Sequence, residues 1–239
     1  MKHATACLAL LALAGCASAN GPRPGDPQRF IGTEAVPSTV IATELAFARE
    51  AREKGQWTAF RRFATDDALW PGPNWENVHA ALKGQADPAQ PILWEPDRVV
   101  LSCDGSYALS TGPATYPSGR TGRFATIWQR QANGDYRLVL DQGFELDGEY
   151  AKPDMIAAEV ADCPSGKRPM PHRTARRGLA WQAEKSDDGT LVWATTLRPD
   201  CSRELVVNAK RGDTMAEVFR RSSAPPPAPP GQGPQAVCE

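Results

Sequence analysis

The chain has few of the residues that metal sites and histidine-dependent sites require. It contains 3 histidines among 239 residues, and its 6 cysteines show neither a CxxC spacing nor a histidine cluster beside them. Structural zinc sites usually draw their four ligands from closely spaced Cys and His pairs. The sequence therefore predicts no metal site, and nothing in it indicates a cofactor.

An excess of charge of either sign is also missing. The 27 Lys and Arg residues balance 28 Asp and Glu, for a net charge of -1. Nucleic-acid-binding domains usually carry a clear basic excess, so this composition argues against nucleic acid as a partner. One segment departs from the balance, because KRPMPHRTARR (167–177) is basic and has no acid. We interpret it as a solvated loop; contact with anionic lipid or an anionic envelope polymer is the alternative.

Beyond the N-terminus no stretch is long and apolar enough to be a transmembrane helix. Lys2 and the short apolar run that follows it are typical of an export signal, predicted over residues 1–15. The tetrapeptide LAGC, which ends at Cys16, resembles the bacterial lipobox, in which the cysteine is lipidated and becomes the mature N-terminus. The alternative is an ordinary secretory signal cleaved after Ala17 or Ala19.

Lipidation of Cys16 would anchor the protein to a membrane through its N-terminal lipid. By resemblance to Gram-negative lipoproteins, Ala17 in place of an acidic residue implies the outer membrane, with the protein facing the periplasm. Residues 16–37 are rich in Pro and Gly and are predicted to form a flexible tether. Residues 222–239 are proline-rich and read as a flexible tail, with a polyproline ligand as the alternative.

Helical periodicity marks the start of the globular part, and β patterning follows it. Residues 38–54 are predicted to form a helix with Ile41 and Leu45 on its buried face, and QWTAFRRFA forms a shorter second helix. From Ile92 onward we expect antiparallel strands, with a hairpin at Asp104-Gly105. Residues 152–162 are expected to form a brief helix, and a four-stranded meander follows.

The order of these elements over about residues 38–146 resembles the nuclear transport factor two-like superfamily, in particular its SnoaL-like bacterial branch. The segments that carry the resemblance are TELAFAREAREKGQWTAFRRFATDDALW, YALSTGPATY and FATIWQRQANGDYRLVLDQG. The resemblance implies an α+β fold, with a conical curved antiparallel sheet packed on the N-terminal helices around a pocket. Relatives include ketosteroid isomerase, scytalone dehydratase, polyketide cyclases and many proteins without catalytic activity.

The predicted globular part extends beyond the resemblance, because the meander lies outside it. The SnoaL-like domain spans 38–150 and an antiparallel β-meander extension spans 151–221. Four cysteines remain once Cys7 leaves with the signal and Cys16 is lipidated, and an even number in an exported protein indicates disulfides. Meander topology favours a Cys163–Cys201 bridge, with Cys103–Cys238 as the weaker complement and free thiols as the alternative for those two.

Asp141 is the candidate functional residue of the last hairpin of this domain. If Asn133-Gly134 is a two-residue turn, counting outward pairs Thr126 with Asp141 and Trp128 with Val139. Asp141 then shares one face of the sheet with aromatic side chains, where partial burial would raise its pKa and suit acid–base chemistry. The competing interpretation, which we favour, is a structural carboxylate hydrogen-bonded to Thr126.

The predicted function follows from this pocket. We expect it to be lined by Trp57, Phe60, Trp70, Phe124, Thr126, Trp128 and Asp141. No histidine falls on the final strands, which argues against a histidine-dependent site. The favoured hypothesis is therefore a non-catalytic envelope lipoprotein that binds a small apolar ligand or acts as a scaffold, for instance as a homodimer. The alternative is an isomerase, cyclase or hydrolase that acts on a small organic substrate through Asp141.

Overall fold

The computed structural model describes residues 35–71, 75–146, 150–151, 153–164, 176–177 and 181–225. All of them belong to one compact unit, Thr33–Glu239. The predictions for Cys16, for tether residues 16–34, for Cys238 and for the proline-rich tail beyond residue 225 lie outside the described residues, as does most of the basic segment. Within the described part of the chain, no helix has the length and apolarity needed to cross a membrane.

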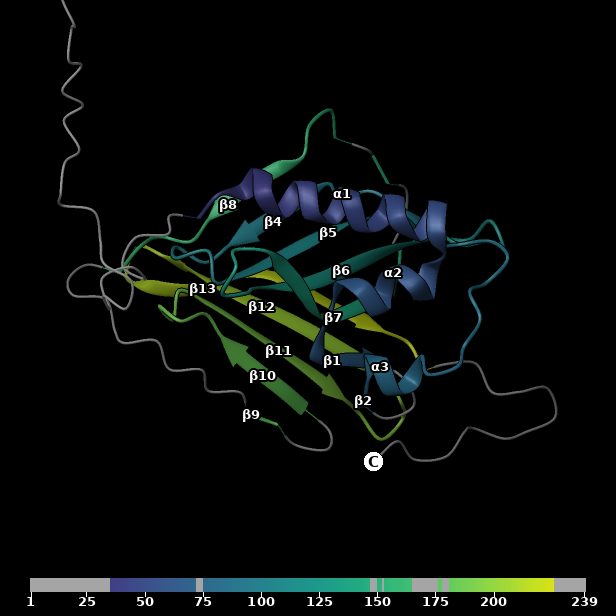
Figure 1. Cartoon of the computed structure of the whole chain (residues 1–239). Helices are drawn as coiled ribbons and strands as arrows, with labels where there is room; N and C mark the ends of the chain where they lie inside the picture. Colours follow the sequence, from purple (N-terminus) through teal and green to yellow (C-terminus); the bar gives the residue numbers. More distant parts are fainter. Residues whose placement is uncertain are drawn as a thin grey trace, which may run out of the picture. The chain divides into compact units, whose positions relative to one another are not determined.

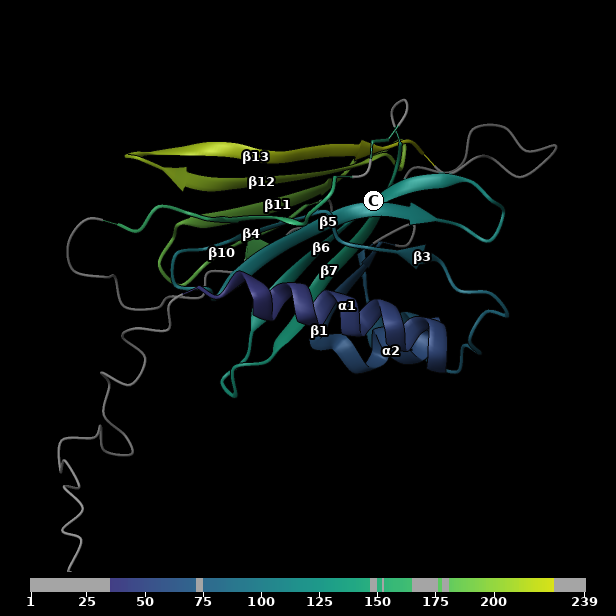
Figure 2. The ribbon, with the colours of Figure 1, turned by 90° about the horizontal axis from the view of Figure 1, so that it is seen from above.

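A mixed sheet forms the middle layer of this unit, with helices on one face and a second sheet on the other (Figure 2). The order of its main strands is β2-β1-β7-β6-β5-β4-β8, and β3 pairs with β5. The strands are β1 (Ala64–Pro71), β2 (Trp75–Asn77), β3 (Leu93–Trp94), β4 (Arg98–Leu101), β5 (Tyr107–Thr115), β6 (Thr121–Arg130), β7 (Tyr136–Glu145) and β8 (Ala157–Val160). The predicted α+β class is confirmed. The sheet is mixed rather than antiparallel because β1 runs parallel to β7, and β8 parallel to β4.

The helices α1 (Pro37–Lys54), α2 (Gln56–Phe63) and α3 (Val78–Ala81) cover the front of this sheet (Figure 1). The buried stripe of α1 includes Val40, Glu44 and Phe47, whereas Leu45 is 45% exposed, so the predicted buried face of α1 is wrong at Leu45. Asp87, which is distant in sequence, caps the N-terminus of α2. The Asp87 carboxylate accepts from the backbone N–H of Thr58 at 2.9 Å and from the Thr58 hydroxyl at 2.6 Å. This contact satisfies an N–H that the first turn of a helix leaves unpaired.

The second sheet is an antiparallel meander, as predicted, but it has five described strands and not four, because the short strand β9 precedes β10. Its order is β13-β12-β11-β10-β9, and its strands are β9 (Arg176–Arg177), β10 (Trp181–Lys185), β11 (Leu191–Leu197), β12 (Arg203–Arg211) and β13 (Thr214–Ser223). Alternate residues of β11 and β12 are buried, and Trp193 and Leu205 pack with Ile127 and Leu140 of the first sheet. The meander therefore shares a hydrophobic core with the back of the first sheet.

The β6–β7 hairpin has the predicted Thr126–Asp141 pairing, but it does not follow from the expected two-residue turn. Arg130 pairs with Tyr136, so the turn is one residue longer than expected, and Gly134 adopts φ 91° within it. An irregularity between Ile127 and Trp128 then restores the register. Trp128 consequently pairs with Leu138 and not with Val139, which corrects the predicted register at that position.

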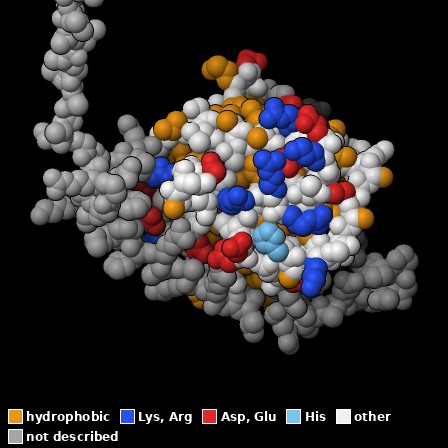
Figure 3. Space-filling view, viewed as in Figure 1, with side chains coloured by type: hydrophobic (Ala, Val, Ile, Leu, Met, Phe, Trp, Pro, Cys, Tyr) orange, Lys and Arg blue, Asp and Glu red, His pale blue; other side chains and the backbone are white. Residues whose placement is uncertain are grey.

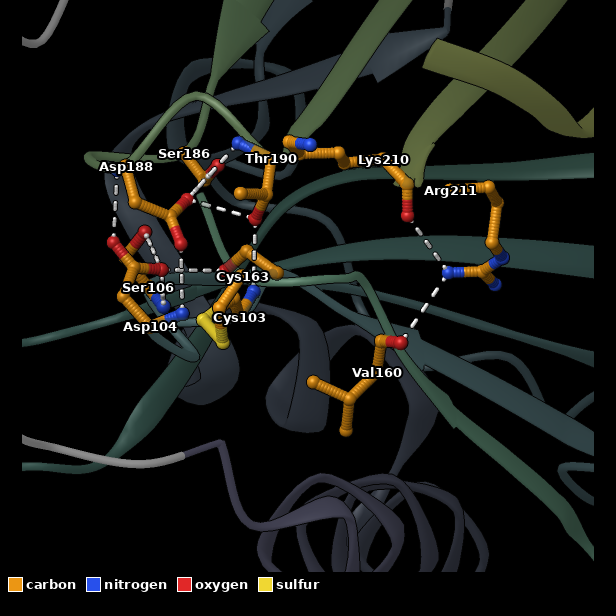
Figure 4. The surroundings of a disulfide bond; sticks show 11 residues. Cys103, Asp104, Ser106, Val160, Cys163, Ser186, Asp188, Thr190, Lys210 and Arg211 are labelled. Atoms are coloured by element: carbon orange, nitrogen blue, oxygen red, sulfur yellow. Dashed lines mark hydrogen bonds between the residues drawn. A yellow bond between two sulfur atoms is a disulfide. The ribbon is translucent and has the colours of Figure 1, made fainter. Parts of the chain in front are cut away.

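Two hairpin tips with the same sequence pattern join the sheets (Figure 4). The segments SCDGS (102–106) and SDDGT (186–190) each place an aspartate third, and its Oδ1 accepts from the flanking hydroxyls. The backbone N–H of Asp104 donates to Oδ2 of Asp188, and that of Asp188 donates to Oδ2 of Asp104, both at 2.9 Å. We call these reciprocal turns the aspartate clasp. Each carboxylate is fully engaged, which indicates a structural role.

The disulfide pairing differs from the favoured prediction. Cys163 is bonded to Cys103, with Cα atoms 5.1 Å apart, and Cys201 is disulfide-bonded as well. The predicted Cys163–Cys201 bridge, and with it Cys103–Cys238, is therefore wrong. The reason is β8, which replaces the helix expected within 152–162. Its parallel pairing of Val160 with Leu101 carries the chain on to place Cys163 beside Cys103.

Candidate functional site

A small cavity lies on the helical side of the first sheet, between the start of α2, the segment leading into β3 and the ends of β5, β6 and β7. Its volume is about 80 Å³. The lining residues are Gln56, Phe60, Ile92, Trp94, Ala114, Tyr116, Phe124, Asp141 and Gly143. Most of this wall is apolar or aromatic, with few polar groups, which is the usual composition of a small-molecule site.

Asp141 is the ionisable carboxyl on the cavity wall. The Thr126 hydroxyl, directly across the β6–β7 ladder, donates to its Oδ2 at 2.6 Å. Among the described residues, its Oδ1 has no hydrogen-bond donor. Burial raises the pKa of Asp141 to about 6, and the bond from Thr126 opposes that rise. The carboxylate can therefore accept one more hydrogen bond, and it changes charge near neutral pH.

Tyr116 closes the outer end of the cavity. A Cβ at Gly143 would lie 2.6 Å from the Tyr116 hydroxyl, and one at Gly122 would lie 3.0 Å from its ring, so the two glycines leave the space that the ring fills. Arg120 stacks on the opposite side, with its guanidinium carbon 4.7 Å from the ring centroid. Burial raises the pKa of Tyr116, so its hydroxyl remains protonated and can donate.

A fully buried glutamate lies behind the cavity. Glu44 accepts from the indole N–H of Trp94 at 2.7 Å, from that of Trp128 at 3.1 Å, and from the Ser110 hydroxyl. Burial raises its pKa to about 7, and the nearby charge of Asp141 adds to the rise. Two carboxyl groups thus share one desolvated region, one on the cavity wall and one behind Trp94.

Aromatic side chains fill most of the space that the sequence assigned to a pocket. The Phe47 ring lies 4.9 Å from that of Phe60, 5.0 Å from that of Trp94 and 5.9 Å from that of Trp128. These edge-on contacts are the arrangement that aromatic pairs favour. The cavity is consequently the small volume that these side chains leave unfilled at one end of the core.

The predicted pocket residues divide between this cavity and the core. The structure places Phe60, Phe124 and Asp141 on the cavity wall. Trp128 and Thr126 are fully buried, and Trp57 packs edge-on against Trp70 with centroids 5.4 Å apart, so these four residues do not line the cavity. Sequence reasoning did not assign Glu44, Gln56 or Tyr116 to the site.

The helical face outside the cavity carries many Lys and Arg side chains (Figure 3). A shallow groove there is lined by Arg49, Lys54 and Arg62, among others. Glu50 accepts from Arg62 and lies 3.8 Å from Lys54, so acidic neighbours offset part of this charge. Because the charge is balanced locally, we assign no site to the groove.

The side chains of the site do not form a metal centre. Within the described ranges, no group of three or more His, Cys, Asp or Glu residues could hold a metal ion. The polar groups that face the cavity are a carboxylate, a phenol and an amide, and the amide of Gln56 already accepts from the backbone N–H of Ile92 at 2.8 Å. This set can bind a small molecule or move a proton.

Comparison with known proteins gives no family assignment for the chain. No protein-family model matches the chain, and no curated protein matches it. One solved structure, of a candidate 6-phosphogluconolactonase from Bacteroides fragilis, aligns at 9% identity with a TM-score of 0.12. The alignment covers 62% of each chain, less than two thirds of its length. A TM-score this low carries no argument about fold or function.

Proposed function

We propose that the protein is a lipid-anchored protein of the cell envelope whose SnoaL-like conical domain binds a small molecule in the Asp141 cavity. The observation that carries the proposal is the unpaired Oδ1 of Asp141 among apolar and aromatic walls. Asp141 is partly exposed and lines the cavity, so a ligand that supplies a donor to Oδ1 would gain a hydrogen bond to a charged group. The apolar walls would add the burial of the ligand's carbon atoms.

The anchor is proposed from the LAGC sequence and has a direct test. Metabolic labelling with a fatty acid is expected to label the wild-type protein and not the Cys16→Ala variant. The Cys7→Ala variant is the matched control, because Cys7 lies within the signal and should not affect labelling. Equal labelling of the Cys16→Ala variant would contradict the proposed anchor.

Ligand binding can be tested on the full-length protein purified from its own membrane in mild detergent. Native mass spectrometry is expected to show a stoichiometric extra mass that organic solvent removes. The Asp141→Asn variant should lose this mass, because the neutral amide binds the ligand's hydrogen-bond donor more weakly than the charged carboxylate does. Asp154→Asn removes an exposed carboxylate from a loop outside the cavity wall and should retain the mass.

Two results together would contradict the binding proposal. The purified wild-type protein would carry no extra mass, and its mass would not change on incubation with small organic molecules. That result would favour scaffolding, with the meander or the sheet edges as the contact surface. The aromatic packing around Phe47 already leaves little free volume, so this outcome is a real test of the proposal.

Acid–base catalysis is the second candidate function, and one observation favours it. The pKa of Asp141 near 6 lies close to the range in which a general base works well, and the Tyr116 phenol lines the same cavity as a proton donor. If a turnover is found, kcat/KM should rise with pH through about 6 as Asp141 ionises. Asp141→Asn should then lower kcat/KM by about 100-fold or more.

A further inference from the structure

The cavity combines aromatic rings with negative charge and has no cation of its own. Phe60, Trp94, Tyr116 and Phe124 supply rings, and Asp141 supplies a carboxylate. Among the described lining residues, none is Lys, Arg or His. Arg120 stacks on the Tyr116 ring but is not one of the lining residues. Because Asp141 is only partly exposed, water stabilises its charge less than at a surface site, and no cation on the described cavity wall offsets the difference.

A positively charged ligand would relieve that arrangement in two ways. Its charge would pair with Oδ1 of Asp141, and its N–H groups would donate to that oxygen. Its charge would also be attracted to the faces of the surrounding rings, since a cation within about 6 Å of an aromatic centroid is stabilised. The Trp94 and Phe124 rings both line the cavity, with centroids 6.4 Å apart, so one small group in the cavity could lie near both rings.

The buried Glu44 strengthens the same preference. Glu44 and Asp141 raise each other's energy when both are ionised, because they share one desolvated region. A cation beside Asp141 would reduce this repulsion, whereas a neutral ligand would leave it and an anion would increase it. The cavity therefore discriminates by charge as well as by size.

We infer that the cavity binds the ammonium end of a small amine, which lies against the aromatic rings with its N–H groups on Asp141. This inference rests on the proposed function and names the chemical class of its ligand.

The volume limits the size of the bound group. A cavity of about 80 Å³ has about half the volume of the ~150 Å³ cavity that takes benzene. It therefore accepts about three heavy atoms in the state described, which matches ethylammonium. Ligands this small bind with dissociation constants in the millimolar range, on the order of 1 mM, because each atom contributes a limited free energy.

The experiment compares ethylammonium with ethanol, which has the same number of heavy atoms and no charge, and with acetate as the anion. Full-length protein in mild detergent, labelled with 5-fluorotryptophan, gives a ¹⁹F signal for Trp94 that the Trp94→Phe variant assigns. At pH 8, ethylammonium is expected to shift this signal with a dissociation constant about tenfold lower than that of ethanol. Acetate should produce no shift.

The Asp141→Asn variant tests the source of the preference. It should bind ethylammonium about tenfold more weakly and ethanol unchanged, while Asp154→Asn should behave as wild type. Unchanged ethanol binding shows at the same time that the variant's cavity is folded. In the wild type, ethylammonium affinity should fall as pH drops through about 6. Among the described residues, Glu44 from α1 and Tyr116 from the β5–β6 connection interact with Asp141. Arg120, from the same connection, and Glu145 of β7 act on Tyr116 and pair with each other.

The outcomes separate this inference from the proposed function. Equal binding of ethanol and ethylammonium, or an ethylammonium affinity that survives in Asp141→Asn, would overturn the amine inference and leave a neutral-ligand site. No shift with any of the three probes would overturn the inference and also count against the proposed function. Tighter binding of acetate would exclude an amine ligand.

Discussion

Replacing Cys103 and Cys163 together by alanine is expected to lower the free energy of unfolding by about 4 kcal/mol. The bond joins residues 60 positions apart, and closing a loop of that length restricts the unfolded chain. Cys103 is 2% exposed, and alanine there keeps an apolar side chain in the core. The loss should therefore come mainly from the missing cross-link.

Urea-induced unfolding followed by tryptophan fluorescence measures this difference. In strong reductant the wild type loses the same bond, so the gap between wild type and the double variant should close. The Cys201 bond is reduced in both proteins under that condition and does not affect the comparison. A gap that persists in reductant would show that packing at Cys103, and not the disulfide, accounts for the loss.

The free energy of unfolding is expected to fall as pH rises from about 4.5 to 7, by about 3 kcal/mol from Glu44 alone. Burial raises the pKa of Glu44 from 4.5 to about 7, so between these values the folded state keeps a proton that the unfolded state has lost. The unfolded state then binds fewer protons, and stability must decrease with pH. Asp141, whose pKa burial also raises, acts in the same direction.

The Glu44→Gln variant is expected to remove most of this slope. Glutamine keeps the shape of the side chain and an acceptor oxygen for the Trp94 indole. Its amide nitrogen cannot accept the hydrogen bond from the Trp128 indole N–H. Unfolding free energies at several pH values between 4.5 and 7.5 give the slope. Glu53→Gln, at an exposed position of the same helix, should follow the wild type. An unchanged slope in Glu44→Gln would assign the effect to other groups.

Local patterns predicted the elements whose partners are neighbours in sequence. The two N-terminal helices, the Asp104-Gly105 hairpin and the meander depend on periodicity and turn residues, and the structure contains each of them. The helix expected within 152–162 is absent from the described residues of that range. The Thr126–Asp141 pairing was also correct, but only because a longer turn and an irregularity offset each other. The register of a hairpin cannot be read from its turn alone when the ladder contains a bulge.

Features that depend on distant partners were not predictable in the same way. The strand β8 exists because it pairs with β4, and the Cys103–Cys163 bond exists because of that pairing. Glu44 was missed because a glutamate in a helix usually faces water. One signal was available: Val40, Glu44, Phe47 and Ala51 follow one helical stripe, which placed a carboxyl in the middle of an apolar face.

The outer strands of both sheets affect whether neighbouring copies of this protein aggregate. An unpaired strand edge can recruit an edge of another molecule, which leads to aggregation. Within the described part of the chain, the outer strands β2, β8 and β9 have 3, 4 and 2 residues, and the fourth, β13, has 10. An irregularity interrupts the β12–β13 ladder, and exposed Arg220 and Arg221 add charge to β13. Molecules concentrated at one surface would therefore resist joining their sheets into fibrils.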